Sequence, residues 1–174
     1  KLLVCGNGGS AADSEHIVGE LMKGFRKKRP VDATFQAKMT ELFPTEGEWI
    51  ANHLQGALPA IALVNHSALS TAFSNDIAGE MVFAQQVFGY GAPGDILLGI
   101  STSGNSANVL NALMVAKAIG MHTIALTGRD GGKMAMQAEL SIIVPHWETP
   151  DIQERHLPIY HTICSIVEEV FFTT

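Results

Sequence analysis

The sequence predicts an α/β fold in which a parallel sheet carries helices on both of its faces. Short apolar runs alternate along the chain with longer amphipathic stretches, which is the pattern of strand–helix units. The short runs are apolar throughout rather than at every second position, as expected for strands that are covered on both faces. Hydrophobic residues make up 47% of the 174 positions and charged residues 16%, so the chain can bury a full core.

Five short apolar runs are predicted to be the strands, namely Leu2–Cys5, Ala60–Val64, Ile96–Ile100, Thr123–Leu126 and Ser141–Val144. The longer stretches are predicted to be helices near Ala11–Met22, Ser67–Phe73, Ala78–Phe88, Ser106–Ile119 and Ile152–Phe172. After the fourth strand, GRDGGK at 128–133 predicts a turn followed by a short helix.

The segment Lys27–Gly56 is longer than an ordinary connection between a helix and a strand, which takes about 2–6 residues. It contains TFQAKMTELF and EWIANHLQGAL, in which apolar residues recur at helical spacing. We therefore expect a single domain over residues 1–174 with a helical insertion at about 27–56, serving as a lid, an oligomer contact or packing. A domain rarely begins on a central strand, so we also expect a further segment before Lys1.

The composition of the chain indicates which kinds of partner and which cellular compartment to expect. A net charge of −6 argues against nucleic acid, and the basic run KGFRKKRP at 23–30 is interpreted as a solvated loop or a phosphate-facing patch. No apolar run reaches the roughly 18 residues of a membrane span, and no cleavable signal is visible. Cys5 and Cys164 lie in apolar runs, which favours buried free thiols and a reducing compartment, the cytoplasm.

Three polar, glycine-rich turns each follow a predicted strand: GNGGS, STSGNS and TGRDGG. In a parallel sheet the loops at the carboxyl ends of the strands converge on one crevice, where ligands bind. STSGNS offers the hydroxyls of Ser101, Thr102, Ser103 and Ser106 at the start of a helix, which predicts a phosphate site, because one serine would suffice for a helix cap. No nucleotide cofactor is expected, since neither the P-loop spacing nor the dinucleotide fingerprint is present.

Five motifs in order, CGNGGSAADSEH, AFSND, GDILLGISTSGNSANV, IALTGRDGGKMA and IQERHLPIYH, resemble the sugar isomerase (SIS) domain family over nearly the whole chain except Lys27–Gly56. The resemblance implies a three-layer αβα sandwich on a five-stranded parallel sheet, of the flavodoxin-like kind. It also implies homotetramers with active sites at subunit junctions. Within the family the motifs look most like those of enzymes of heptose biosynthesis, which convert sedoheptulose 7-phosphate to D-glycero-D-manno-heptose 7-phosphate through an enediol.

The resemblance also assigns roles residue by residue. It places the sugar hydroxyls on Asn7, Gly8, Gly9, Asn75, Asp76 and Gln153, and the phosphate on Ser101, Thr102, Ser103 and Ser106. Moving a proton between two carbons needs a base and an acid, and the matching positions are Glu20 and His161. Some members hold zinc with the side chains that match His16, Glu20, Gln153 and His161, so zinc is a candidate cofactor although glutamine is an unusual zinc ligand.

Helical spacing is compatible with that set of four. His16 and Glu20 are four residues apart and share a helix face, while Gln153 and His161 lie about 80° apart on one broad face. Pro158 falls between Gln153 and His161, where it removes a backbone hydrogen bond and is expected to bend the helix.

The chain departs from the family pattern at two positions. Gly24 stands where the family commonly has an arginine, and Pro150 where it has an acidic residue. Two alternatives therefore stay open: a non-catalytic SIS-domain scaffold or regulator that binds a replication initiator, and an isomerase or sensor for another phosphosugar. The presence of all four polar residues favours the enzyme, because a scaffold has no need of them.

Overall fold

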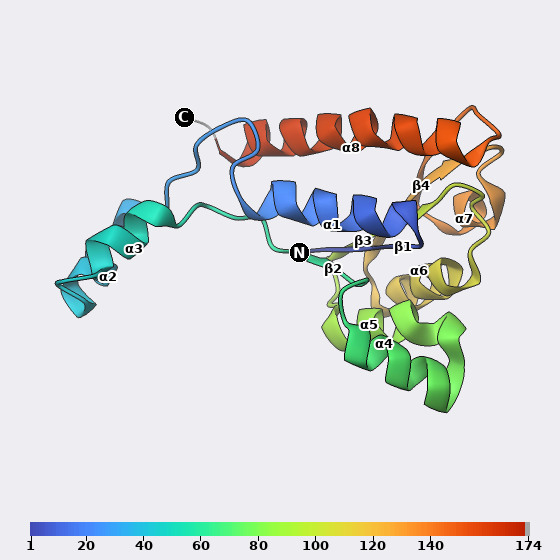
Figure 1. Cartoon of the computed structure of the whole chain (residues 1–174), viewed down its shortest axis with the longest axis horizontal. Coiled ribbons are helices and arrows are strands. Elements are labelled where there is room, and N and C mark those ends of the chain that lie inside the picture. The colour runs from blue at the N-terminus through green and yellow to red at the C-terminus, as the bar shows by residue number, and fades with distance from the viewer. Residues whose placement is uncertain (173–174) are drawn as a thin grey trace.

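The computed structural model describes residues 1–172 and contains the predicted parallel sheet (Figure 1). The five strands are β1 Leu2–Gly6, β2 Ala60–Ala62, β3 Ile96–Ser101, β4 His122–Gly128 and β5 Leu140–Val144. Every pairing is parallel, and the spatial order is β2-β1-β3-β4-β5. The chain leaves β1 toward β2 and then crosses to β3 on the other side. The crevice between the ends of β1 and β3 is therefore the place where such a sheet binds ligands.

Helices cover both faces of the sheet, which gives three layers (Figure 1). The helices α1 Gly9–Met22 and α8 Thr149–Phe171 lie on one face, and α4 Ser67–Phe73, α5 Val82–Tyr90, α6 Ala107–Ile119 and α7 Gly132–Gln137 lie on the other. Consecutive residues of β1 point to opposite faces of the sheet: Leu3 packs with α5 and α6, and Val4 packs with α1 and α8. The three-layer αβα sandwich is confirmed.

Most element boundaries agree with the predictions within a few residues. The helix predicted at Ala78–Phe88 is wrong at its start, because a π-helical turn at Ser74–Ala78 and a 3₁₀ turn at Gly79–Met81 precede α5. The predicted strand Ala60–Val64 ends at Ala62, although the N–H of Leu63 still bonds to the carbonyl of Val4 at 2.9 Å. α8 continues through Pro158, and Pro150 lies in its first turn, where proline needs no hydrogen-bond partner.

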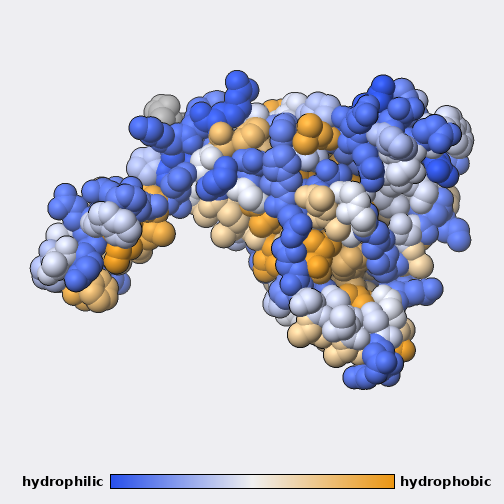
Figure 2. All heavy atoms as spheres, in the orientation of Figure 1, coloured by the Kyte–Doolittle hydropathy of each residue, from blue (hydrophilic) through white to orange (hydrophobic). Residues whose placement is uncertain are grey.

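Two helices within the predicted insertion, α2 Ala33–Leu42 and α3 Gly47–His53, form a hairpin that projects from the domain (Figure 1). An antiparallel bridge between Pro30 and Gln55 closes its base. Asp32 caps α2 by accepting the N–H of Phe35 at 2.9 Å. Figure 2 shows apolar residues along one edge of the hairpin, and Trp49 is 64% exposed. The hairpin therefore presents apolar surface to its surroundings.

Two further predictions concern the thiols and the membrane. Cys5 and Cys164 are free and buried, as predicted, and burial raises the pKa of Cys5 to about 12 and that of Cys164 to about 11. Both thiols therefore stay protonated and unreactive at neutral pH. Of the helices within residues 1–172, none has the length and apolar character needed to cross a membrane.

Candidate active site

The turn after β3 gathers hydroxyl groups at the N-terminus of α6. The Oγ of Ser101 lies 2.9 Å from that of Ser106 and 3.5 Å from that of Ser103. Ser106 directly precedes α6, yet within the described residues its side chain makes no capping hydrogen bond. The hydroxyls therefore form a cluster at the positive end of α6, which suits the phosphate that the sequence predicts.

Backbone geometry explains the glycine in this turn. Gly104 has a φ of +64°, and a Cβ there would overlap the carbonyl group of Gly131 in the turn after β4. The carbonyl of Thr102 accepts the N–H of Gly128 at 3.2 Å, which ties the same two turns together. The turns after β3 and β4 thus form one rigid edge around the hydroxyls.

The turn after β1 is held beside the same helix end. Asn7 and Asn108 exchange two side-chain amide hydrogen bonds of 2.9 Å, so Asn7 lies next to the first turn of α6. Gly8 has a φ of +58°, and a Cβ on Gly9 would overlap the amide of Gln153. The structure therefore brings Asn7, Gly8, Gly9 and Gln153 to one end of the sheet.

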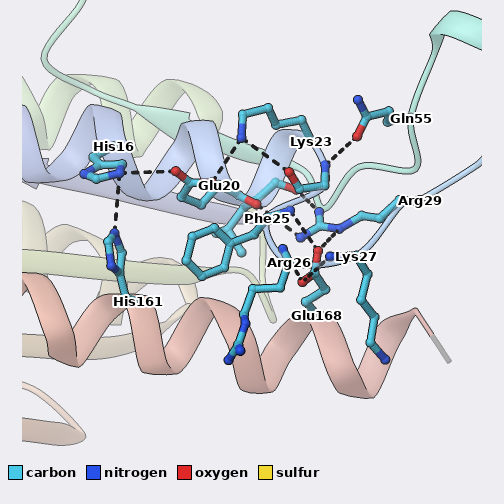
Figure 3. A network of polar contacts seen from close by, with 12 residues as sticks. His16, Glu20, Lys23, Phe25, Arg26, Lys27, Arg29, Gln55, His161 and Glu168 are labelled. Atoms are coloured by element: carbon cyan, nitrogen blue, oxygen red, sulfur yellow. Dashed lines mark hydrogen bonds and ion pairs between the residues drawn. The ribbon is translucent and has the colours of Figure 1, made fainter.

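A second group of polar side chains lies further along α1 and α8 (Figure 3). His16 Nε2 is 3.2 Å from Glu20 Oε1 and 3.5 Å from His161 Nε2. Lys23 Nζ donates to the other oxygen of Glu20 at 3.1 Å. The side chain of Glu20 is 14% exposed and that of His16 41% exposed. The carboxylate is therefore largely shielded from solvent, and the neighbouring imidazole of His16 is accessible. The structure thus brings His16, Glu20 and His161 together.

Tyr160, which bonds to Asp13, holds the imidazole ring of His16 through its Nδ1 atom, the ring nitrogen that does not face Glu20. Tyr160 donates to Asp13 Oδ1 at 3.3 Å, and its oxygen is 3.0 Å from His16 Nδ1. Burial raises the pKa of Tyr160 above its usual range and raises the pKa of Asp13. The phenol has one proton, and when Asp13 receives it, His16 Nδ1 must carry its own proton and donate. This assignment leaves Nε2 directed at Glu20 and His161.

Sequence reasoning missed the residues that support this group, although two of their positions carried a signal. Tyr160 immediately precedes His161, Asp13 lies one turn before His16, and Asn108 follows the serine-rich turn. Lys23 begins the basic run KGFRKKRP. Asp13 and Lys23 each lie three positions from a predicted site residue, so helix-face spacing was the available clue for them. The contacts of Tyr160 and Asn108 depend on packing between elements and carried no such signal.

Gln153 belongs with the turn after β1 and not with the His16–Glu20–His161 group, and Asn75 and Asp76 lie in a separate turn. Gln153 is eight positions before His161, about 12 Å along the axis of α8, and packs against Gly9. Asn75 and Asp76 are exposed in the π-helical turn, where Asn75 Nδ2 donates to Asp76 Oδ1 at 2.9 Å. Among residues 1–172, neither makes a side-chain hydrogen bond to a predicted site residue outside this pair.

The predicted zinc ligands are only partly gathered. The separations of 3.2 and 3.5 Å at His16 are near the roughly 3.3 Å between two donors that lie about 2.0–2.1 Å from a tetrahedral zinc ion. Gln153 lies elsewhere, however, and in the described part of the chain no group of three or more His, Cys, Asp and Glu side chains is arranged as a metal site. The donor types suit zinc, but one chain as arranged does not present the full set, so zinc stays a prediction.

The chain resembles known proteins over almost its whole length. It is 43% identical over 171 residues to a phosphoheptose isomerase of Nitratiruptor, covering 98% of this chain and 78% of that protein. The corresponding enzyme of Aliarcobacter butzleri is 44% identical over 168 residues, with coverage of 97% and 75%. Both alignments extend across the predicted insertion.

Solved structures agree with the sequence relatives. The phosphoheptose isomerase of Neisseria gonorrhoeae matches with a TM-score of 0.75 at 39% identity, covering 97% of this chain and 76% of the other. That of Francisella tularensis matches with a TM-score of 0.78 at 34% identity and the same coverage. The SIS domain family itself matches residues 36–128, which include most of the α2–α3 hairpin. The chain therefore belongs to the SIS domain family, in the branch that contains the phosphoheptose isomerases.

Proposed function

We propose that this protein is a phosphoheptose isomerase, which converts sedoheptulose 7-phosphate to D-glycero-D-manno-heptose 7-phosphate. The observation that carries the proposal is the pairing of a hydroxyl-lined helix N-terminus with a carboxylate–imidazole group, in a chain more than 40% identical to enzymes of that name. A sugar phosphate needs the first feature, and proton transfer between carbons needs the second.

In the mechanism we propose, Glu20 is the base and His161 the acid. Glu20 removes the proton from C1 of the ketose, and the electron pair forms the C1–C2 double bond of the enediol. His161 donates a proton to the C2 carbonyl oxygen as that bond forms. Return of a proton to C2, and loss of one from the C1 hydroxyl, then give the aldose. The phosphate turn contributes by fixing the sugar, since an anchored phosphate orients the distant carbons.

Replacing Ser103 and Ser106 together by alanine should weaken binding of sedoheptulose 7-phosphate at least about 100-fold, because each hydrogen bond to a charged group contributes about 1.5–3 kcal/mol. Calorimetric titration measures the change. Thr40→Val is the control, since Thr40 bonds only within the projecting hairpin. Unchanged affinity in the double variant would refute the phosphate site.

The substrate is tested with a panel of five-, six- and seven-carbon ketose phosphates monitored by NMR. Turnover of sedoheptulose 7-phosphate alone is the expected result. Turnover of a different sugar would identify another phosphosugar isomerase. Binding of a protein partner without any turnover would identify a scaffold.

We also propose that the enzyme is a homotetramer whose subunits share each site. The rise of about 1.5 Å per residue along α1 places Glu20 about 16 Å from the turn at Gly9. An extended seven-carbon phosphate spans about 10 Å at bond lengths of about 1.5 Å. A second subunit that brought its phosphate turn to Glu20 would close this gap.

Exposed apolar surface supports assembly. Between α1 and α8 lies an apolar groove of about 540 Å³, lined by residues that include Leu21, Leu58, Ile96 and Val167. Figure 2 shows apolar residues gathered on the body of the domain below α1. A monomer would leave this surface in water, which is unfavourable.

Light scattering should therefore report a tetramer, and mixing should restore activity between two inactive variants. If sites are shared, mixed tetramers of Glu20→Gln and Ser103→Ala/Ser106→Ala chains contain some sites with both an intact turn and an intact base. Tetramers that exchange subunits and regain no activity would contradict shared sites, and an active monomer would contradict the assembly.

Zinc and location complete the proposal. Metal analysis of the purified protein tests whether zinc binds at His16, Glu20 and His161.

We place the enzyme in the cytoplasm, which the two buried free thiols, Cys5 and Cys164, support.

A further inference from the structure

A buried ion pair that the proposed mechanism does not use lies at the end of α1 (Figure 3). Arg29 Nε is 2.7 Å from Glu168 Oε1, and the two side chains are 0% and 1% exposed. A buried pair contributes little net stability, because the cost of removing both charges from water offsets their attraction. The directed hydrogen bonds that the pair makes are therefore more informative than its charge.

Arg29 binds the backbone of the proposed base. Its Nη1 donates to the carbonyl of Leu21 at 2.8 Å and its Nη2 to the carbonyl of Glu20 at 3.1 Å. Carbonyls in the last turn of a helix lack partners within the helix, and that end attracts a cation. The last turn of α1 has no basic residue of its own. Arg29 supplies the cation from the following loop and holds the turn that carries Glu20.

Glu168 organises the loop between α1 and Arg29. Its carboxylate accepts the backbone N–H groups of Phe25, Arg26 and Lys27 at 2.9, 2.8 and 3.2 Å. Burial alone would raise the pKa of Glu168, but these N–H groups and Arg29 outweigh it and lower the pKa, so the group is ionised. The loop in turn places the ring of Phe25 5.2 Å from that of His161.

The pair also links the two helices that carry the proposed acid and base. Glu168 follows His161 by seven residues, two turns further along the same side of α8. α1 and α8 run in the same direction, since Gly9 meets Gln153 near their N-termini and His16 meets His161 further on. A contact between the end of α1 and Glu168 therefore fixes how far α1 can slide along α8.

We infer that Arg29 and Glu168 are a positioning pair that sets Glu20 at its working distance from His161. The inference rests on the proposed roles of Glu20 and His161. Neither Arg29 nor Glu168 reaches the reacting atoms, and both act through the backbone of the Glu20 turn and the Phe25 loop.

The test replaces the pair by apolar residues of similar size, Arg29→Met with Glu168→Leu. Such swaps often preserve stability, so we expect a folded protein. The backbone groups that now bond to Arg29 and Glu168 lose these partners, so the thermal midpoint should fall below that of the wild type while the protein stays folded. We expect KM to stay near its wild-type value and kcat to fall about 10²-fold, the loss that a misplacement of about 1 Å can cause. Hydrogen exchange at the amides of residues 20–23 should accelerate.

Two variants keep the test decisive if the double variant does not fold. Arg29→Lys keeps the charge but offers one nitrogen in place of the three that now bond to Glu168, Leu21 and Glu20, so it cannot match their geometry and should lower kcat about tenfold. Glu154→Gln, an exposed glutamate on the same helix that does not contact this loop, is the control and should leave kcat unchanged.

A folded double variant with wild-type kcat would overturn the inference, as would Arg29→Lys with wild-type kcat. If the wild type turns over no heptose phosphate, the proposed function fails. The exchange rates then decide separately whether the pair holds the end of α1.

Discussion

Glu20→Gln should lower turnover of sedoheptulose 7-phosphate by roughly 10²–10⁴-fold, the usual cost of losing a general base. The amide has the size and shape of the carboxylate, its oxygen can accept from Lys23 Nζ, and its NH₂ group can donate to His16 Nε2, the two atoms that now lie beside the Glu20 carboxylate. It cannot take a proton from carbon. Sugar-phosphate binding should therefore stay close to that of the wild type while the chemical step is lost.

Exchange of the C1 proton with deuterium from the solvent measures the step directly. In the wild type the enediol returns to substrate and carries deuterium into the ketose. In Glu20→Gln this exchange should slow by the same factor as turnover. Glu15→Gln is the control, because Glu15 is an exposed carboxylate on the same helix. If Glu20→Gln exchanged the proton at the wild-type rate, Glu20 would not be the base.

The parts of the fold that depend on local pattern could be predicted from sequence. Strands buried on both faces read as short apolar runs, and all five predicted strands differ from the observed ones by no more than three residues in length. The start of α5 could not be predicted, since the 3₁₀ turn at Gly79–Met81 lies inside the run predicted as helix from Ala78. A single 3₁₀ turn is too short for hydrophobic periodicity to distinguish it from α-helix.

The site residues, too, could be predicted only where their relation depends on spacing along one helix. Spacing along a helix predicted that His16 and Glu20 share a face, and their contact at 3.2 Å agrees. The angle around the helix also suggested that Gln153 and His161 act together. That angle takes no account of the rise of about 1.5 Å per residue, which separates the two along the helix axis. The Arg29–Glu168 pair joins positions 139 residues apart, and only the packing of α1 on α8 brings them together.

His161→Ala should lower turnover by a similar factor of roughly 10²–10⁴, because the carbonyl oxygen would lose the group placed to protonate it. An imidazole suits this role since it can give and regain a proton in each turnover. Binding of the sugar phosphate should persist, because His161 is not part of the phosphate turn. Thr162→Ala, next to His161 and exposed, is the control and should turn over at the wild-type rate.

Chemical rescue can separate loss of the acid from loss of structure. The ring of His161 lies 5.0 Å from that of His16 and 5.2 Å from that of Phe25, so its removal leaves a space with an aromatic wall. Imidazole added to the solution should enter this space and restore part of the turnover of His161→Ala in a saturable way. It should leave Glu20→Gln unaffected, since a free imidazole cannot replace a carboxylate held at the end of α1. Wild-type turnover in His161→Ala, or equal rescue of both variants, would show that His161 is not the acid.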